Sequence, residues 1–102
     1  MRLGDIAKVV RSKNAGPFIM TFDVLFDSEQ TLERIRAGGR LTRDSVAAAY
    51  GVSPNAILDF DYYPFARAVK FSIRRPVPSG SAGDTDVYGA QQHVPLLELD
   101  VG

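Results

Sequence analysis

The chain has 102 residues, of which 45% are hydrophobic and 24% charged, which predicts a single globular domain spanning residues 1–102. Lysine plus arginine and aspartate plus glutamate number 12 each, so the formal net charge is zero. This balance disfavours a dedicated nucleic-acid-binding protein, which normally carries an excess of basic residues. It favours association with other chains, because molecules without net charge repel one another weakly.

The chain contains no cysteine, which excludes disulfides, iron–sulfur clusters, zinc–thiolate sites and cysteine nucleophiles. The first residues are not followed by the apolar run of a signal peptide, and no stretch has the length of a membrane span. We therefore expect a soluble cytoplasmic protein that does not contact a membrane.

The N-terminal segment, residues 3–13, places its apolar residues at nearly helical spacing and predicts a short helix. Pro17 forbids helix beyond the turn over residues 11–17. Residues 18–26 then alternate between two faces and predict a central strand. A polar cap at Ser28 and the pair Gly38-Gly39 bound the next helix.

A further helix is predicted from Thr42 to Gly51, and residues 56–63 and 67–74 predict a hairpin with a wide turn. The outer face of the first hairpin strand is acidic and that of the second is basic, so we expect charge pairing between them. The long segment 75–95 has no clean periodicity and is expected to be a loop ordered by contacts with another chain. Residues 96–101 predict a last strand, with Leu97, Leu99 and Val101 facing inward.

This element order predicts an α+β protein with a ferredoxin-like, antiparallel-rich sheet and helices on one face. It also has an N-terminal helix, and a long irregular crossover replaces the second helix of that fold. The predicted core consists of Phe18, Met20, Phe22, Val24, Leu32, Ile35, Val46, Leu58, Phe60, Val69, Phe71, Ile73, Leu97 and Leu99.

The first segment with candidate chemistry gathers two cations, a hydroxyl and an amide beside a glycine, in Arg11, Ser12, Lys13, Asn14 and Gly16. Such a turn can hold a carboxylate or phosphate through backbone N–H groups and charged hydrogen bonds. The alternative is an ordinary helix C-terminus, where basic residues complement the dipole and Asn or Gly caps the helix.

The second segment contains Asp84 and Asp86 among serine, threonine and glycine. Two carboxylates at this spacing can bind a hard cation, although such residues also bond their own backbone in turns. The third segment contains Gln91, Gln92 and His93, the only histidine. His93 can act as a general acid or base, or it can be a structural surface residue. We predict no metal site and identify no cofactor.

The stretches Arg11–Phe18 and Pro78–His93 resemble the two signatures of a small uncharacterised bacterial family, and the resemblance covers essentially the whole chain. Members are typically encoded beside proteins like AtuA, an acyclic-terpene-utilisation protein. Those larger proteins carry a ferredoxin-fold domain with an Arg-Ser-Gly-Asp-Lys-Gly turn placed like residues 11–16 here. The resemblance implies a ferredoxin-like domain that works beside a larger catabolic protein.

We therefore expect an accessory subunit of an AtuA-like enzyme, with one polar anion-binding site built from residues 11–17 and 78–93. Its ligand-binding residues would be Arg11, Ser12, Lys13, Asn14, Gly16, Asp86, Gln91 and Gln92, with Asp84 and His93 as catalytic candidates. Two alternatives stay open: a stand-alone lyase or hydratase acting on a carboxylate or acyl-CoA, and a non-catalytic module that binds a small anion. The partner would be the AtuA-like protein, a further copy of this chain, or both.

Overall fold

The computed structural model describes residues 1–16, 18–74 and 94–102 of the chain. In chain order the helices and strands are α1 (Leu3–Ile6), β1 (Val9–Asn14), β2 (Ile19–Leu25), α2 (Glu29–Gly38), α3 (Arg43–Tyr50), β3 (Ile57–Tyr63), β4 (Ala68–Arg74) and α4 (Val94–Leu97). Single turns of 3-10 helix, Pro54–Ala56 and Pro64–Ala66, precede β3 and join it to β4. The second of these is the wide hairpin turn that the sequence predicts.

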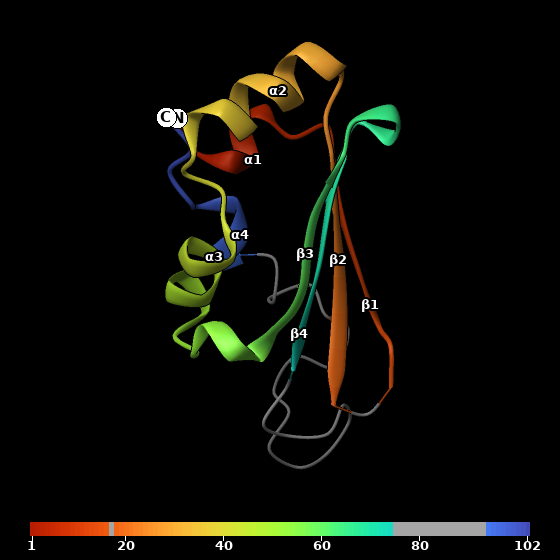
Figure 1. Ribbon diagram of the computed structural model, residues 1–102, viewed down its shortest axis with the longest axis vertical. Coiled ribbons are helices and arrows are strands. Elements are labelled where there is room, and N and C mark those ends of the chain that lie inside the picture. Colours follow the sequence, from red (N-terminus) through yellow and green to blue (C-terminus); the bar gives the residue numbers. More distant parts are fainter. Residues whose placement is uncertain (17, 75–93) are drawn as a thin grey trace.

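The four strands form one sheet in the order β1-β2-β4-β3, and every neighbouring pair is antiparallel. Consequently β2 and β3 run in the same direction with β4 between them, and α2 and α3 form the crossover that joins them. This is the split β-α-β unit of ferredoxin-like folds, so the predicted fold class is confirmed. The described helices lie on one side of the sheet (Figure 1).

The two middle helices begin and end where the sequence predicts. The Ser28 hydroxyl accepts the N–H three residues along the chain, and Thr42 and Ser45 form a reciprocal capping box. Gly39 and Gly51 end these helices in left-handed conformation, with φ of 68° and 67°. Local chemistry therefore determines both helices before any packing is considered.

The core lies between the sheet and the helices. Its centre is a stack of Phe22 on β2 against Phe71 on β4, with ring centroids 4.9 Å apart. Leu32, Ile35 and Val46 cover it from α2 and α3. Burial of these side chains is the main force that holds the helices on this face.

The predicted helix over residues 3–13 is wrong beyond Ile6, because the chain turns at Ala7 and residues 9–14 form strand β1. This strand pairs with β2 over its whole length, from Val9 opposite Leu25 to Asn14 opposite Met20. A short isolated helix is marginal, whereas pairing with β2 satisfies the backbone groups of β1 that face that strand. The edge strand thus comes from the N-terminal side of β2 rather than from the C-terminal end of the chain.

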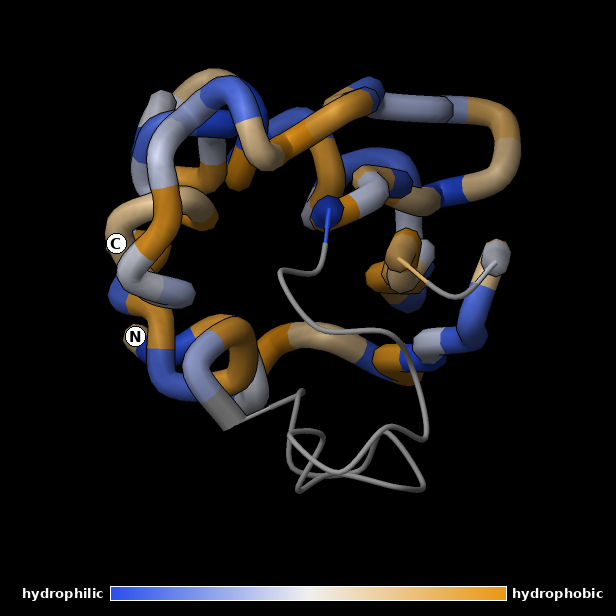
Figure 2. Tube along the Cα trace, turned by 90° about the horizontal axis from the view of Figure 1, so that it is seen from below, coloured by the Kyte–Doolittle hydropathy of each residue, from blue (hydrophilic) through white to orange (hydrophobic). Residues whose placement is uncertain are grey.

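The predicted strand over residues 96–101 is also wrong. Residues 94–97 form α4, with Leu96 buried and Leu97 and Leu99 only half-buried; Val101 is buried as expected. The segment pairs with the N-terminal residues at an isolated bridge between Arg2 and Asp100, where the Leu3 N–H donates to the Leu99 carbonyl and the Val101 N–H to the Met1 carbonyl. The two chain ends therefore lie side by side on the helix side of the molecule (Figures 1 and 2).

Two further core predictions are corrected. Phe18 is 48% exposed, because it lies beyond the last paired residues of β1 and β2. Leu58 is half-buried, because a β-bulge between Ile57 and Asp59 makes Leu58 the extra residue and turns Ile57 into the core. Phe60 lies on the core side but is only partly buried.

Candidate functional site

The face of the sheet opposite the helices, which we call the open face, carries polar side chains from all four strands. Its positions alternate with the core positions, and the strand register aligns them in rows across β1, β2, β4 and β3. The apolar row is Val9, Leu25, Ala68 and Tyr63; the charged row is Arg11, Asp23, Lys70 and Asp61; and the hydroxyl row is Lys13, Thr21, Ser72 and Asp59.

The charged row alternates in sign from one strand to the next. The Asp23 carboxylate lies 3.7 Å from the Arg11 guanidinium and 3.8 Å from the Lys70 ammonium. Charge pairing is expected within the β3–β4 hairpin, and the register places Asp61 opposite Lys70. The ion pair of Lys70, however, goes to Asp23 on the other neighbouring strand. Both cations of this row therefore share one carboxylate, whose charge offsets one of the two.

The hydroxyl row has a neutral centre with a charge at each edge. The Thr21 and Ser72 hydroxyl oxygens lie 3.1 Å apart and share a hydrogen bond between β2 and β4. Lys13 stands at the β1 edge and Asp59 at the β3 edge. Within the described part of the chain, no carboxylate forms an ion pair with Lys13. Its ammonium is therefore available to an anion from outside these residues.

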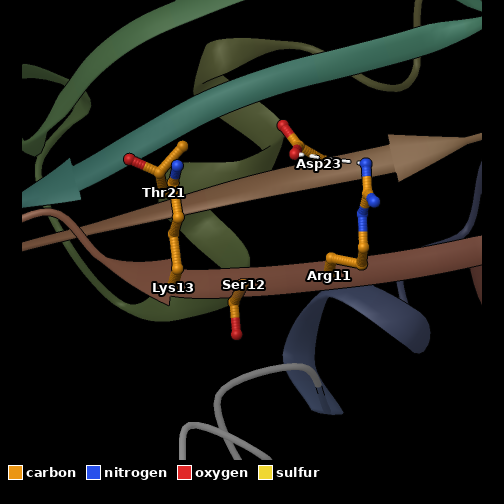
Figure 3. Close-up of a pocket in the computed structure, with 5 residues that line it drawn as sticks. All are labelled: Arg11, Ser12, Lys13, Thr21 and Asp23. Atoms are coloured by element: carbon orange, nitrogen blue, oxygen red, sulfur yellow. Dashed lines mark ion pairs between the residues drawn. The ribbon is translucent and has the colours of Figure 1, made fainter.

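A shallow hollow of about 370 Å³ lies over the β1–β2 part of this face. In Figure 3, Arg11 and Lys13 point from β1 over the neighbouring strand toward Asp23 and Thr21, whereas Ser12 points away. The hollow is open and lined by charged and hydroxyl groups. It suits a small polar molecule better than an apolar one.

One end of the sheet, which we call the turn end, combines the β1–β2 turn with the last residue of β4. The Ala15 N–H donates to the Ile19 carbonyl at 2.9 Å, and Gly16 adopts a φ of 123°, in a region that favours glycine. Arg74 lies opposite Ile19 in the neighbouring strand. The end of β1, the start of β2 and the end of β4 therefore lie together at this end of the sheet.

The structure divides the predicted anion-binding cluster between two faces. Arg11 and Lys13 lie on the open face, whereas the alternation of β1 places Ser12 and Asn14 on the helix side and Gly16 in the turn. The other predicted site residues, Asp84, Asp86, Gln91, Gln92 and His93, lie outside the described residues. Their proximity to Arg11 and Lys13 thus stays a prediction.

The open face offers cations, hydroxyl groups and isolated carboxylates. Cations and hydroxyls together hold carboxylate or phosphate oxygens through charged hydrogen bonds. Residues 1–16, 18–74 and 94–102 contain no group of three or more histidine, cysteine, aspartate or glutamate side chains placed to bind a metal ion. The cations and hydroxyl groups of the open face thus have the chemistry of groups that bind anions.

Sequence reasoning did not single out Thr21, Asp23, Ser72 and Arg74 as site residues. The signal was present, because Thr21, Asp23 and Ser72 each lie between two core positions of a predicted strand, and Arg74 follows the core position Ile73 at the end of one. The misassignment of residues 9–14 as helix removed the strand that carries Arg11 and Lys13. Without it, the four-strand rows could not be assembled.

No helix within the described ranges has the length and apolar character needed to cross a membrane. A family model described as "Domain of unknown function (DUF4387)" matches residues 3–100. No curated protein and no solved structure matches the chain. The match agrees with the predicted membership of an uncharacterised family, while the link to AtuA-like proteins stays a prediction.

Proposed function

Because the chain belongs to the DUF4387 family, whose description names no activity, we propose its function from the geometry of the open face. We propose that it is a small cytoplasmic accessory domain that works with a larger AtuA-like catabolic protein and holds a small anion at the turn end. The anion is a carboxylate or phosphate, alone or as part of a larger substrate.

One observation carries this proposal. Lys13 and Arg74 both project from the open face near the turn end, and neither forms an ion pair with a carboxylate of the described residues. The other two cations of the open face, Arg11 and Lys70, are paired with Asp23. On the open face, an anion therefore meets two cations without a carboxylate partner among the described residues at this end, and two cations that share the Asp23 carboxylate farther from it.

Two further features support the same location. The Thr21–Ser72 hydroxyl pair lies next to Lys13 in its row, so its oxygens can hydrogen-bond a bound anion. Gly16, which belongs to the first stretch that resembles a family signature, lies at this same end of the sheet. The proposal concerns binding, because the proton-transfer candidates Asp84 and His93 lie outside the described residues.

A titration with acetate, inorganic phosphate and coenzyme A, followed by amide chemical shifts, tests the anion site. We expect shifts centred on the turn end, and at least tenfold weaker binding in Lys13→Ala and Arg74→Ala. Lys8→Ala is the matched control, because Lys8 is an exposed cation at the opposite end of β1. Equal binding by all three variants would contradict the proposed site.

Coexpression with the AtuA-like protein tests the accessory role. We expect the two chains to purify together and the complex to separate from either chain alone on size exclusion. A chain that never elutes with the larger protein would contradict the accessory role and leave only the binding module.

A further inference from the structure

We propose that a second copy of this chain packs its open face against the open face of the first. The two copies are related by a two-fold axis that runs parallel to the strands, between β2 and β4. This dimer goes beyond the proposed anion site and is argued from the strand register and charges of the whole face, although the two share Lys13, Thr21 and Ser72.

The four strands lie symmetrically about that axis, with β1 and β2 on one side and β4 and β3 on the other. Rotation about the axis places β1 of one copy over β3 of the other, and β2 over β4. Each row of one copy then lies over the same row of the other, read in the opposite direction. In each row, the β1 residue of one copy therefore faces the β3 residue of the other, and the β2 residue faces the β4 residue. The face is complementary to itself if both of these pairs attract each other.

The charged row meets this condition at all four positions. Arg11 faces Asp61 of the second copy, and Asp23 faces its Lys70. The row reads plus, minus, plus, minus, so its reversal places each charge opposite the other sign. Lys70 and Asp61 of the first copy meet the same partners in return.

The hydroxyl row also meets the condition. Lys13 faces Asp59 of the second copy, and Thr21 faces Ser72, so an unpaired cation meets a carboxylate and hydroxyls meet hydroxyls. Facing sheets in sandwiches are rotated by about 30°, which offsets the edge pairs by a few ångströms. Lysine and arginine side chains are long enough to span this offset. Lys13 has three donors, so it can bond Asp59 and still face an anion at the turn end.

The apolar row supplies contact area at the other end of the face. Val9 is 40% exposed and Tyr63 is 44% exposed, at opposite edges of the sheet. Reversal of the row places Val9 against Tyr63 of the second copy and Leu25 against its Ala68. The two exposed apolar side chains thus cover each other, which removes apolar surface from water.

The alternative two-fold axis, perpendicular to the strands and in the plane of the interface, gives the opposite result. It places β1 over β1 and β2 over β2, so that, with the charged row on the axis, Arg11 meets Arg11 and Asp23 meets Asp23. Like charges in contact disfavour an interface. The charge pattern therefore selects the axis parallel to the strands.

The size of the face predicts a weak dimer. Strands about 4.8 Å apart with a rise of about 3.3 Å per residue make a face about 20 Å square, or about 400 Å² per copy before side-chain relief is added. Complexes that bury less than about 1,200 Å² in total are typically weak or transient. We expect a dissociation constant in the micromolar range and weaker association at high salt, since part of the interaction is between charges.

A charge-swap experiment tests the arrangement. Lys13→Glu and Asp59→Lys are made in separate chains, and sedimentation equilibrium gives the mass of each alone and of their mixture. The two residues stand on opposite edge strands, each beside a neutral hydroxyl, so neither change creates a like-charge neighbour within its row. Each variant alone places like charges in contact twice, and we expect its dimer to be at least roughly tenfold weaker than the wild-type dimer.

The mixture restores both contacts. Glu on the first chain faces Lys on the second, and the unchanged Asp59 faces the unchanged Lys13, so we expect a heterodimer about as tight as the wild-type dimer. Lys8→Glu and Asp44→Lys are matched reversals outside the open face, and their mixture and their separate chains should all behave like the wild type. Thermal unfolding of each chain verifies that it folds; if a reversal does not fold, Lys13→Gln and Asp59→Asn replace it, each expected to weaken the dimer.

Three results would overturn the proposal. These are a wild-type chain that stays monomeric up to millimolar concentration, reversal variants that dimerise as well as wild type, and a mixture that fails to form the heterodimer. All masses are measured without anion or larger partner, so this outcome is separate from that of the anion titration.

Discussion

Replacement of Phe22 by alanine should destabilise the protein by about 4 kcal/mol. Phe22 is 1% exposed, stacks on Phe71 at 4.9 Å and contacts Tyr50 with ring centroids 5.8 Å apart. Loss of the buried ring removes about 2 kcal/mol of transfer free energy. A residual cavity of about 80 Å³ adds about 2 kcal/mol more, because the two strands and α3 prevent the site from collapsing fully.

Urea unfolding at one fixed, low protein concentration measures this loss, since dimerisation would otherwise make the apparent stability depend on concentration. The slope of free energy against urea should be unchanged, and the midpoint should fall. Phe65→Ala is the control, because Phe65 is 97% exposed and its truncation should cost less than about 0.5 kcal/mol. If Phe22→Ala does not fold, Phe22→Leu should lose about 1–1.5 kcal/mol. A loss below about 1 kcal/mol for the alanine variant would refute the assignment of the buried face.

Three other predictions follow from particular side chains. Tyr62→Phe should lose about 1 kcal/mol in urea unfolding, because the Tyr62 hydroxyl donates to the Leu41 carbonyl at 2.6 Å. Burial raises the pKa of the Tyr50 phenol above 10.0, although a hydrogen bond with the Leu96 backbone opposes the rise. The unfolded chain releases that proton first, so stability should fall above pH 10 by up to about 1.4 kcal/mol per pH unit, and a smaller slope is expected for Tyr50→Phe. Tyr63→Ala should weaken the dimer in sedimentation without changing which charge-swap chains pair, since Tyr63 contributes area rather than charge.

Local signals in the sequence predicted the middle of the molecule well. The caps at Ser28 and Thr42 and the glycines at 39 and 51 set both helices, because these residue types satisfy or end a helix through their own backbone and side-chain chemistry. The alternation in residues 18–26 and 67–74 predicted the two central strands, because one face of each strand packs on the core and the other carries the polar side chains of the open face.

The edges of the fold could not be predicted in the same way. Residues 9–14 combine weak helical spacing with weak alternation, and pairing with β2 decides between them. That pairing is a tertiary interaction, which overrides local preference in so short a segment. The alternating residues 96–101 show the converse case, because no described strand offers them a partner beyond the single bridge of Asp100 to Arg2.

The candidate site follows the same logic. Arg11 and Lys13 were recognised as chemically distinctive, but their shared face appears only when β1 is a strand. Once β1 is placed as a strand, the sheet register shows where opposite charges lie together. Asp23 lies between Arg11 and Lys70 and offsets part of their positive charge. Lys13 and Arg74, which have no ion pair among the described residues, then lie on the open face toward the turn end, which composition alone could not show.

The charges and the apolar row of the open face have different roles in the proposed dimer. Exposed ion pairs contribute little net free energy, because desolvation and side-chain ordering offset the attraction between the charges. Reversing the sign of one edge charge nevertheless turns attraction into repulsion, so the charges set which orientation forms. Burial of Val9 and Tyr63 carries no orientational information but supplies free energy in proportion to area. A weak dimer with one defined arrangement is therefore what a small sheet face with alternating charge and one apolar row should produce.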